Sequence, residues 1–157
     1  MEQQYRIYMD VCCLNRPFDD WTQPRIRLEA EAVLDIVAAC QANTWQLVSS
    51  TALESEIAKT PDLLRRQRVM ASLKIAQTRI IVTVAMLERA KELVALGFKP
   101  FDALHLSCAE SANVDIFLTT DDRLLRKASA NQTSLNVTVA NPVQWFMEIS
   151  QLEGENK

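Results

Sequence analysis

The fold of this chain is decided by residues 100–122, which read PFDALHLSCAESANVDIFLTTDD. The first half has the pattern of a helix with an acid, Asp102, in its first turn, and the second half predicts a buried strand, 116–119, that leads to Asp121. In an open parallel α/β sheet, the carboxyl ends of the strands and the first turns of the following helices face one crevice, where ligands bind. We therefore expect Asp102 and Asp121 to point at the same place.

Strand-like and helical segments alternate along the rest of the chain, with no repeat or linker between them. This alternation predicts an α/β fold with a parallel sheet that is covered on both faces and connected by right-handed crossovers. One domain is expected over 1–152, followed by a polar tail, 153–157, that we expect to be disordered. The predicted strands are 6–9, 45–49, 79–82, 116–119 and, at the edge, 135–140. The predicted helices are 24–40, 51–59, 61–75, 84–96, 100–113, 123–130 and one that begins at 142.

Composition excludes several functional classes. Two glycines are too few for a Walker or dinucleotide-binding loop, and one histidine cannot build a histidine-rich zinc site. The four cysteines lack the spacing of a disulfide framework, so we expect them to be reduced. The first residues have no leader pattern and no apolar run is long enough to cross a bilayer, which predicts a cytoplasmic protein without membrane contact. A hydrophobic content of 48% over 157 residues is typical of one folded domain, and the net charge of −3 argues against a uniformly basic surface.

Further acids occupy equivalent places in the pattern. Asp10 directly follows the predicted strand 6–9, and Glu54 and Glu56 lie in the helix after the second strand. A lone aspartate after a strand is usually a turn residue, and a helix-capping role is worth about 1 kcal/mol. Two carboxylates roughly 5 Å apart repel by about 3 kcal/mol at an effective dielectric near 20, so capping alone would not hold such a cluster together.

A cluster of carboxylates either takes up protons or binds a hard divalent cation through its oxygens. Because the chain offers no zinc-type ligand set, Mg²⁺ or Mn²⁺ is the expected cofactor. Such an ion activates water and neutralises the charge that builds up on a phosphoryl group, which phosphodiester hydrolysis requires. The pattern therefore predicts a metal-dependent phosphodiesterase in which either Glu54 or Glu56 joins the aspartates.

Basic residues are concentrated in two places. Arg16 lies in a polar and aromatic loop, 15–21, beside the expected site, and Arg65, Arg66 and Arg68 lie close together in the helix 61–75. Such a run is often only a solvated helix face, but it can also hold the backbone of a polyanion. We interpret these four arginines as candidate contacts to nucleic acid.

Four segments, in this order, resemble the PIN domain family. They are Asp10 after the first strand, Glu56 before the helical Ile57, the run 102–105, and Leu-Thr-Thr-Asp at 118–121. The resemblance extends over almost the whole chain and implies a three-layer α/β/α sandwich with a central parallel sheet of four to five strands. It also implies a Mg²⁺- or Mn²⁺-dependent endoribonuclease, in bacteria often the toxin of a toxin-antitoxin pair. RNA, a cognate antitoxin and a second copy of the chain are then the expected partners.

The resemblance also assigns roles to individual residues. Glu56 is preferred to Glu54, which is kept as its substitute. Thr119 is expected to orient a carboxylate and Asp122 to help with charge or water. His105 is expected to be either a satisfied core histidine or a support for the site. The catalytic and metal-binding residues, called the four acids below, are then Asp10, Glu56, Asp102 and Asp121.

The resemblance is incomplete after the first strand. Members of the family often carry Thr or Ser and then Asn after the first Asp, whereas this chain has Val11 and Cys12. These residues offer less polar support to a metal-binding carboxylate. The alternative function is therefore a PIN-like domain that is catalytically weak or inactive and binds RNA or protein.

Overall fold

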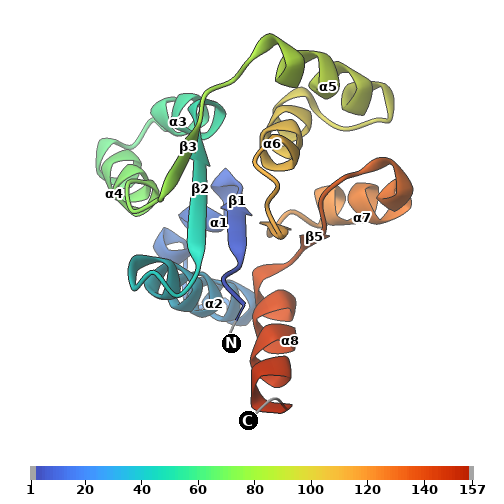
Figure 1. The fold of residues 1–157 in the computed structure, drawn as a ribbon. Coiled ribbons are helices and arrows are strands. Elements are labelled where there is room, and N and C mark those ends of the chain that lie inside the picture. Colours follow the sequence, from blue (N-terminus) through green and yellow to red (C-terminus); the bar gives the residue numbers. More distant parts are fainter. Residues whose placement is uncertain (1–2, 156–157) are drawn as a thin grey trace.

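Five parallel strands form one sheet, in the order β3-β2-β1-β4-β5, in the computed structural model, which describes residues 3–155 (Figure 1). The central strand β1 pairs in parallel with both neighbours, so that Ile7 lies opposite Leu47 of β2 and Ile116 of β4. The expected parallel sheet is confirmed. The strands are β1 (Arg6–Met9), β2 (Gln46–Ser50), β3 (Thr78–Ile80), β4 (Ile116–Leu118) and β5 (Val139–Ala140).

Helices fill the connections between the strands. Two of them begin where the sequence offers a capping hydroxyl, because Ser50 accepts a hydrogen bond from the backbone N–H of Leu53 and Thr83 accepts one from that of Met86. None of the described helices is long and apolar enough to cross a membrane. The helices are α1 (Val11–Asn15), the 3₁₀ helix η1 (Arg16–Phe18), α2 (Pro24–Gln41), α3 (Thr51–Ala58), α4 (Leu63–Leu73), α5 (Val84–Ala95), α6 (Pro100–Ser111), α7 (Asp122–Ala130), the 3₁₀ helix η2 (Gln132–Ser134) and α8 (Pro142–Glu155).

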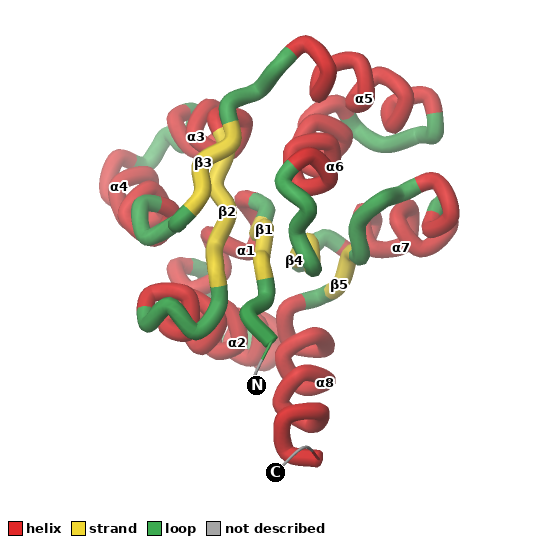
Figure 2. The backbone as a smooth tube through the Cα atoms, in the orientation of Figure 1, coloured by secondary structure: helices red, strands yellow, loops and turns green. Residues whose placement is uncertain are grey.

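The order of the strands determines the layers. From β1 the chain steps to β2 and β3 in one direction, and then returns to the far side of β1 to form β4 and β5. With right-handed crossovers, this reversal puts the helices before β3 on one face of the sheet and those between β3 and β5 on the other. Figure 2 shows α3 and α4 on one side of the strands, and α6 and α7 on the other. The molecule is a three-layer α/β/α sandwich, as the resemblance implied.

The same reversal creates a topological switch point between β1 and β4. In open α/β sheets, ligands bind outside the carboxyl ends of the strands at such a point. The carboxyl ends of β1 and β2 point upward in Figure 1, and α8 extends from the opposite side of the molecule. The residues that follow β1 and β4, Asp10 and Thr119, therefore lie where the topology predicts a site.

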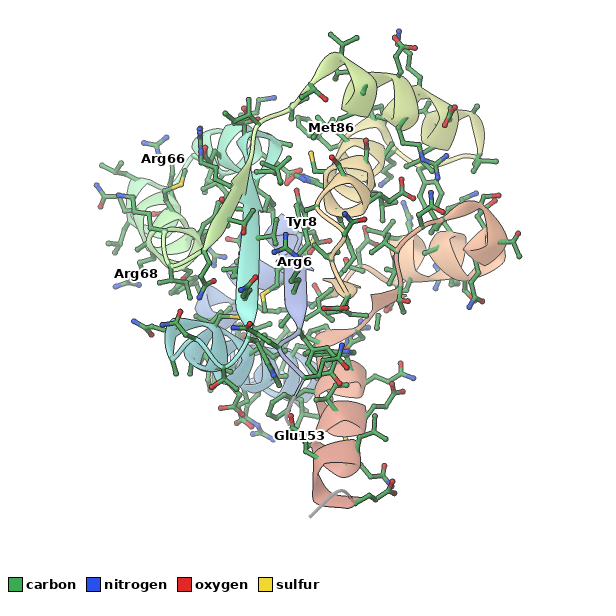
Figure 3. All side chains as sticks on the ribbon, in the orientation of Figure 1. Arg6, Tyr8, Arg66, Arg68, Met86 and Glu153 are labelled. Atoms are coloured by element: carbon green, nitrogen blue, oxygen red, sulfur yellow. The ribbon has the colours of Figure 1, made fainter. Side chains whose placement is uncertain are left out.

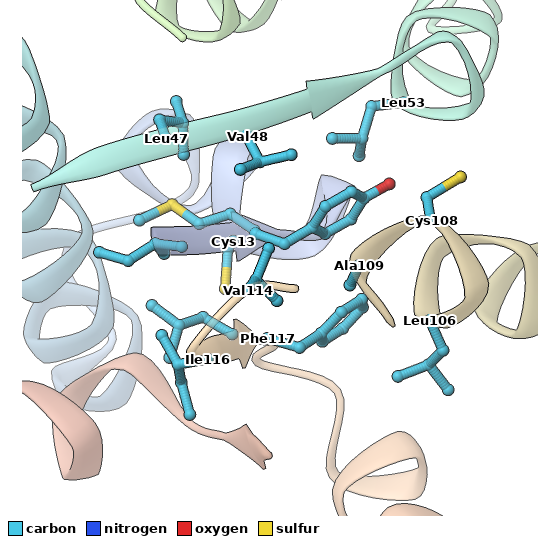
Figure 4. Packing of buried hydrophobic residues seen from close by; sticks show 14 of the residues in the cluster. Cys13, Leu47, Val48, Leu53, Leu106, Cys108, Ala109, Val114, Ile116 and Phe117 are labelled. Atoms are coloured by element: carbon cyan, nitrogen blue, oxygen red, sulfur yellow. The ribbon is translucent and has the colours of Figure 1, made fainter. Parts of the chain in front are cut away.

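The apolar core fixes the strands in register. Tyr8 of β1 and Phe117 of β4 are fully buried and their rings stack, with centroids 5.3 Å apart. In Figure 4, Val48 from β2 and Leu53 from α3 pack in the same cluster as Phe117. Because a slip of one residue would turn every core side chain of a strand to the other face, the register is strongly specified. The polar residues just beyond the strand ends are therefore held in fixed positions.

The structure corrects the predicted starts of two elements. The loop expected over 15–21 begins with the end of α1 and with η1, and α1 itself was not expected. It forms because the Asp10 carboxylate accepts a hydrogen bond from the backbone N–H of Cys13 and caps the helix. Helix α4 begins at Leu63, since Asp62, and not Thr60, provides the capping side chain. In both places the side chain that caps the helix is an aspartate.

Two elements near the end of the chain also differ from the prediction. The strand expected over 135–140 is reduced to Val139 and Ala140, although its place at the edge of the sheet is confirmed. An edge strand is paired on one side only, so fewer hydrogen bonds extend it. The tail expected from 153 is helical as far as Glu155, because no proline interrupts α8, and residues 156–157 lie outside the described part.

Candidate active site

Asp10 lies buried at the carboxyl end of β1, with 5% of its surface exposed. Its Oδ1 accepts a hydrogen bond from the backbone N–H of Cys13 at 3.0 Å, and its Oδ2 accepts one from the hydroxyl of Thr119. Burial raises the pKa of the Asp10 carboxyl to about 6, although both hydrogen bonds favour the charged form. The fold thus holds an acid in a place where its charge lacks the solvation of water.

Thr119 connects this acid to the next segment. It follows β4, is fully buried, and accepts a hydrogen bond at 3.0 Å from the backbone N–H of Asp121 while it donates to Asp10. The hydroxyl of Thr119 therefore contacts the carboxylate of Asp10 and the backbone of Asp121. The structure places Thr119 where the sequence predicted a residue that orients a carboxylate.

Asp102 and Asp121 both lie at helix starts. Asp121 caps α7, because its Oδ1 accepts from the backbone N–H groups of Arg123 and Leu124 at 2.9 and 3.4 Å. Asp102 lies in the first turn of α6, where Pro100 occupies the first position. Burial first, and then the charge of Asp121, raise the pKa of the Asp102 carboxyl. The charge of Asp121 therefore acts on the Asp102 carboxyl, and the expectation that the two aspartates point at the same place stays a prediction.

Helix α3 separates the two candidate glutamates. Glu54 is held by the guanidinium of Arg79, with the closest pair of atoms 2.8 Å apart, which lowers the pKa of its carboxyl. Glu56 instead has its Oε1 3.4 Å from Nε2 of His105. Residues two apart on a helix point to different sides, so only one of them can face the aspartates. The arrangement favours Glu56 and leaves Glu54 in a surface ion pair.

Cys12, the second residue after Asp10, is a free and exposed cysteine. The pKa of this thiol is raised to about 12, first by desolvation and then by the charges of all four acids. The charges of all four acids therefore act on the side chain of Cys12. Because the thiol stays protonated at neutral pH, it is not a nucleophile there.

The donor set of the four acids consists of carboxylate oxygens, which suit Mg²⁺ and Mn²⁺. Within residues 3–155, no three His, Cys, Asp or Glu side chains come close enough together to hold a metal ion. Carboxylates repel one another unless a cation screens them, so acids that share a crevice are expected to stand apart without one. The chemistry of the residues fits a hard divalent cation, and binding one requires the acids to approach each other.

The carboxylate of Asp122 is paired with an arginine. It accepts two hydrogen bonds from Arg25 of α2, at 2.7 and 2.8 Å, and this pairing lowers its pKa. Arg25 also donates to the backbone oxygen of Thr120 at 3.3 Å. Asp122 therefore ties α7 to α2 and is not directed toward the other acids. Sequence spacing gave no sign of this contact, because Arg25 lies 97 residues from its partner.

Two of the four candidate arginines are engaged inside the protein. Arg16 pairs with the buried Glu29 at 2.9 Å and with Asp19 at 3.1 Å. Arg65 pairs with Asp19 at 2.8 Å and donates to the backbone oxygen of Phe18 at 2.7 Å. These contacts fasten η1 to α2 and α4. Both residues therefore hold the segment after β1, and their contact with nucleic acid stays a prediction.

The other two arginines lie on the outer side of α4, as Figure 3 shows. Arg66 donates to the backbone oxygen of Thr60 at 3.3 Å. Arg68 is exposed, and its guanidinium has no hydrogen-bond or ion-pair partner among residues 3–155. Of the predicted patch, Arg68 is the residue whose charge is most available to a ligand.

Comparison with known proteins agrees with this fold. The family model described as PIN domain matches residues 7–130. The crystal structure of VapBC2 from Rickettsia felis, bound to a DNA fragment from their promoter, is similar with a TM-score of 0.55 and 12% sequence identity. The match covers 87% of this chain and 98% of that one, and at this identity the likeness concerns the fold alone. No curated protein is similar enough to the chain to count as a match.

Proposed function

Because the chain belongs to the PIN domain family, we propose that it is a Mg²⁺- or Mn²⁺-dependent endoribonuclease that uses the four acids. The observation that carries the proposal is the lack of ion pairs between these acids and basic side chains. Among the described residues, no Lys or Arg forms an ion pair with any of them, and the polar partner of the Glu56 carboxylate is His105. Acids elsewhere in the fold that are buried or half-buried, such as Glu29 and Glu110, are paired with arginines. A bound cation would supply the missing positive charge.

The fold prepares the acids for this role in different ways. Asp10 is oriented by Thr119 and by the amino end of α1, and Asp121 is oriented by the amino end of α7. Asp102 lies in the first turn of α6, and Glu56 of α3 has its carboxylate beside Nε2 of His105. A divalent ion held by the four acids would polarise the scissile phosphate and lower the pKa of water. The protein contributes the placement of the acids and a partly desolvated setting in which their charges act strongly.

The structural likeness to a VapBC protein supports a more specific proposal about partners. VapBC2 is a complex bound to promoter DNA according to its description, and this chain shares its fold. We propose that RNA is the substrate, that an antitoxin protein is the natural partner, that the chain acts in the cytoplasm, and that it is able to pair with a second copy of itself. The alternative is a PIN domain that binds RNA without cleaving it, because Val11 and Cys12 give the site little polar support.

A cleavage assay with a matched pair of variants tests the proposal. The purified chain is incubated with structured and unstructured RNA, with Mn²⁺, with Mg²⁺ and with a chelator. We expect cleavage only with a divalent ion, and we expect Glu56→Gln and Asp102→Asn to abolish it. Glu54→Gln is the control, since it makes the same change two residues away, in a side chain that is paired with Arg79.

Binding of RNA with no cleavage under any of these conditions would support the alternative. Equal cleavage by wild type, Glu56→Gln and Asp102→Asn would reject the proposed use of the acids. Both outcomes are informative only if the variants are folded, which circular dichroism establishes.

A further inference from the structure

A buried series of side chains, from Ser50 through Tyr8 to His105, leads to Glu56. The hydroxyl of Tyr8 lies 2.7 Å from Oγ of Ser50 and 2.7 Å from Nδ1 of His105. The other ring nitrogen of His105, Nε2, lies 3.4 Å from Oε1 of Glu56. Tyr8, Ser50 and His105 are at most 1% exposed. We call these four residues the Tyr8 network, and Figure 3 shows Tyr8 between β1 and α6.

The Glu56 end of the Tyr8 network determines which atoms donate, and the contacts at the Ser50 end are compatible with that order. At one end, the backbone N–H of Leu53 can only donate, and it is 3.1 Å from Oγ of Ser50. At the other end, an ionised carboxylate can only accept, so the proton between His105 and Glu56 must belong to Nε2. In a neutral imidazole, Nδ1 is then an acceptor and receives the hydroxyl proton of Tyr8. The oxygen of Tyr8 in turn accepts from the hydroxyl of Ser50.

The opposite order is unfavourable at the Glu56 end. If Nδ1 of His105 donated to Tyr8, the lone pair of Nε2 would face the carboxylate of Glu56. The distance of 3.4 Å between Nε2 and Oε1 is near the outer limit for a hydrogen bond. Whether the two groups attract or repel each other depends on which ring nitrogen carries the proton. It is an attraction in one tautomer and a repulsion in the other.

We propose that the Tyr8 network holds His105 in the tautomer protonated at Nε2, so that its N–H positions the Glu56 carboxylate at the mouth of the site. Ser50, Tyr8 and His105 are thus positioning residues, and the importance of the position they fix rests on the proposed function. Each donor in the network points toward Glu56. No proton has to be transferred along it.

The surroundings of the Tyr8 network keep it rigid. The ring of Tyr8 stacks on Phe117 with centroids 5.3 Å apart, and the ring of His105 stacks on Phe101 at 6.3 Å. Burial raises the pKa of the Tyr8 hydroxyl well above its usual range, so the phenol remains a donor at every physiological pH. Because the hydroxyl of Tyr8 contacts Nδ1 of His105, the tautomer is set before any ligand binds.

The chain contains one histidine, so its imidazole nitrogens give one set of signals in a ¹⁵N nuclear magnetic resonance spectrum. The wild type without metal is measured at about pH 8, where an ordinary histidine is neutral. We expect Nε2 to be protonated and Nδ1 to be a bare acceptor. Protonation at Nδ1 alone, or at both nitrogens, would overturn the proposal. This measurement needs no variant and no activity.

Two tyrosine variants then test the effect on Glu56. Tyr8→Phe removes the donor to Nδ1, and Tyr5→Phe removes a hydroxyl from a ring that packs on Trp45 and Trp145, outside the Tyr8 network. We expect Tyr8→Phe to mix the two tautomers and to weaken binding of Mn²⁺ alone, measured by calorimetry, at least about tenfold. We expect Tyr5→Phe to change neither.

The two proposals fail in different ways. If the wild type binds no Mn²⁺ but shows the Nε2–H tautomer, the proposed function fails and the structural role of the Tyr8 network stands. If the wild type binds Mn²⁺ and a folded Tyr8→Phe binds it equally well with an unchanged tautomer, the Tyr8 network does not position Glu56.

Discussion

The hydroxyl of Thr119 donates a hydrogen bond to Oδ2 of Asp10, and this contact joins the ends of two adjacent parallel strands. It is a direct consequence of strand register, because Met9 pairs with Leu118 and the next residue on each strand is then a neighbour. The backbone repeats the link, since the N–H of Asp10 donates to the oxygen of Leu118 at 3.1 Å. The central sheet pairing and the candidate site are therefore built by the same residues.

Replacing Thr119 tests how much this hydroxyl contributes. Thr119→Val keeps the shape of the side chain but removes the donor to Asp10 and the acceptor for the N–H of Asp121. We expect a loss of about 2 kcal/mol in the free energy of unfolding at neutral pH, as for a buried hydrogen bond to a charged group. Thr119→Ser, which keeps the hydroxyl, should lose clearly less. Urea denaturation measures both, and a loss in Thr119→Ser as large as that in Thr119→Val would mean that the hydroxyl contributes no more than the methyl group.

Asp10 should make the stability of the metal-free protein depend on pH. Its pKa is about 6 in the folded state, compared with an ordinary value near 3.8. Below about pH 4 the carboxyl is protonated in both states, but between pH 4 and 6 only the unfolded chain gives up the proton. Stability is therefore lost as the pH rises through this window, by up to about 3 kcal/mol in total.

The variant Asp10→Asn lacks this titration. We expect it to unfold with nearly the same free energy as the wild type at about pH 4 and to be more stable at about pH 8, while it has no nuclease activity. Denaturation with a chelator present, at several pH values, measures the difference. A difference that is constant with pH would show that Asp10 is not the titrating group.

The sequence best predicted the helices and strands that face the apolar core. Strands β1 and β4 and the long helix α2 were recognisable because their apolar periodicity follows from facing a core. The helix α1 was missed, since five residues are too few to show a period and its cap, Asp10, was assigned only to the site.

The site could be predicted only in part, for a related reason. The topology brings Asp10, Asp102 and Asp121 to one edge of the sheet, and alternating segments are enough to predict that topology. Contacts between side chains far apart in sequence were not predictable. Arg65 reaches Asp19 across 46 residues, and the sequence alone could only mark Arg65 as basic. The choice between Glu54 and Glu56 likewise depended on which helix face the distant Arg79 occupies.

Arg65 and Arg68 should therefore behave differently when replaced. Arg65→Ala removes an ion pair and a hydrogen bond that hold the segment after β1, so we expect it to lower the unfolding temperature. Arg68→Ala should leave the unfolding temperature unchanged and reduce the slope of log affinity for RNA against log salt by about 1, if Arg68 contacts a phosphate. An unchanged slope would remove Arg68 from the interface. The experiment is done with a catalytically inactive variant, so that RNA is bound but not cut.

Arg25 should control the placement of Asp121 without touching it. Its guanidinium holds Asp122 and the backbone oxygen of Thr120, the residues on either side of that acid. Because the side chain of Arg25 is 54% exposed, its ion pair with Asp122 adds little to global stability, about 1 kcal/mol at most. Its second ion pair is with the buried Glu29, which remains paired with Arg16 in the variant. We expect Arg25→Ala to lower cleavage and Mn²⁺ affinity by about 10- to 100-fold, as for a residue that orients a metal ligand.

Arg27→Ala is the matched control for Arg25→Ala, because Arg27 lies on the same helix, is exposed, and has no hydrogen-bond or ion-pair partner for its side chain among the described residues. The same loss of charge is then made two residues from Arg25 but without breaking the contact. If both variants lose activity equally, the effect is due to net charge and RNA attraction. If only Arg25→Ala does, the loss comes from the segment that carries Asp121, and Mn²⁺ affinity should fall with it.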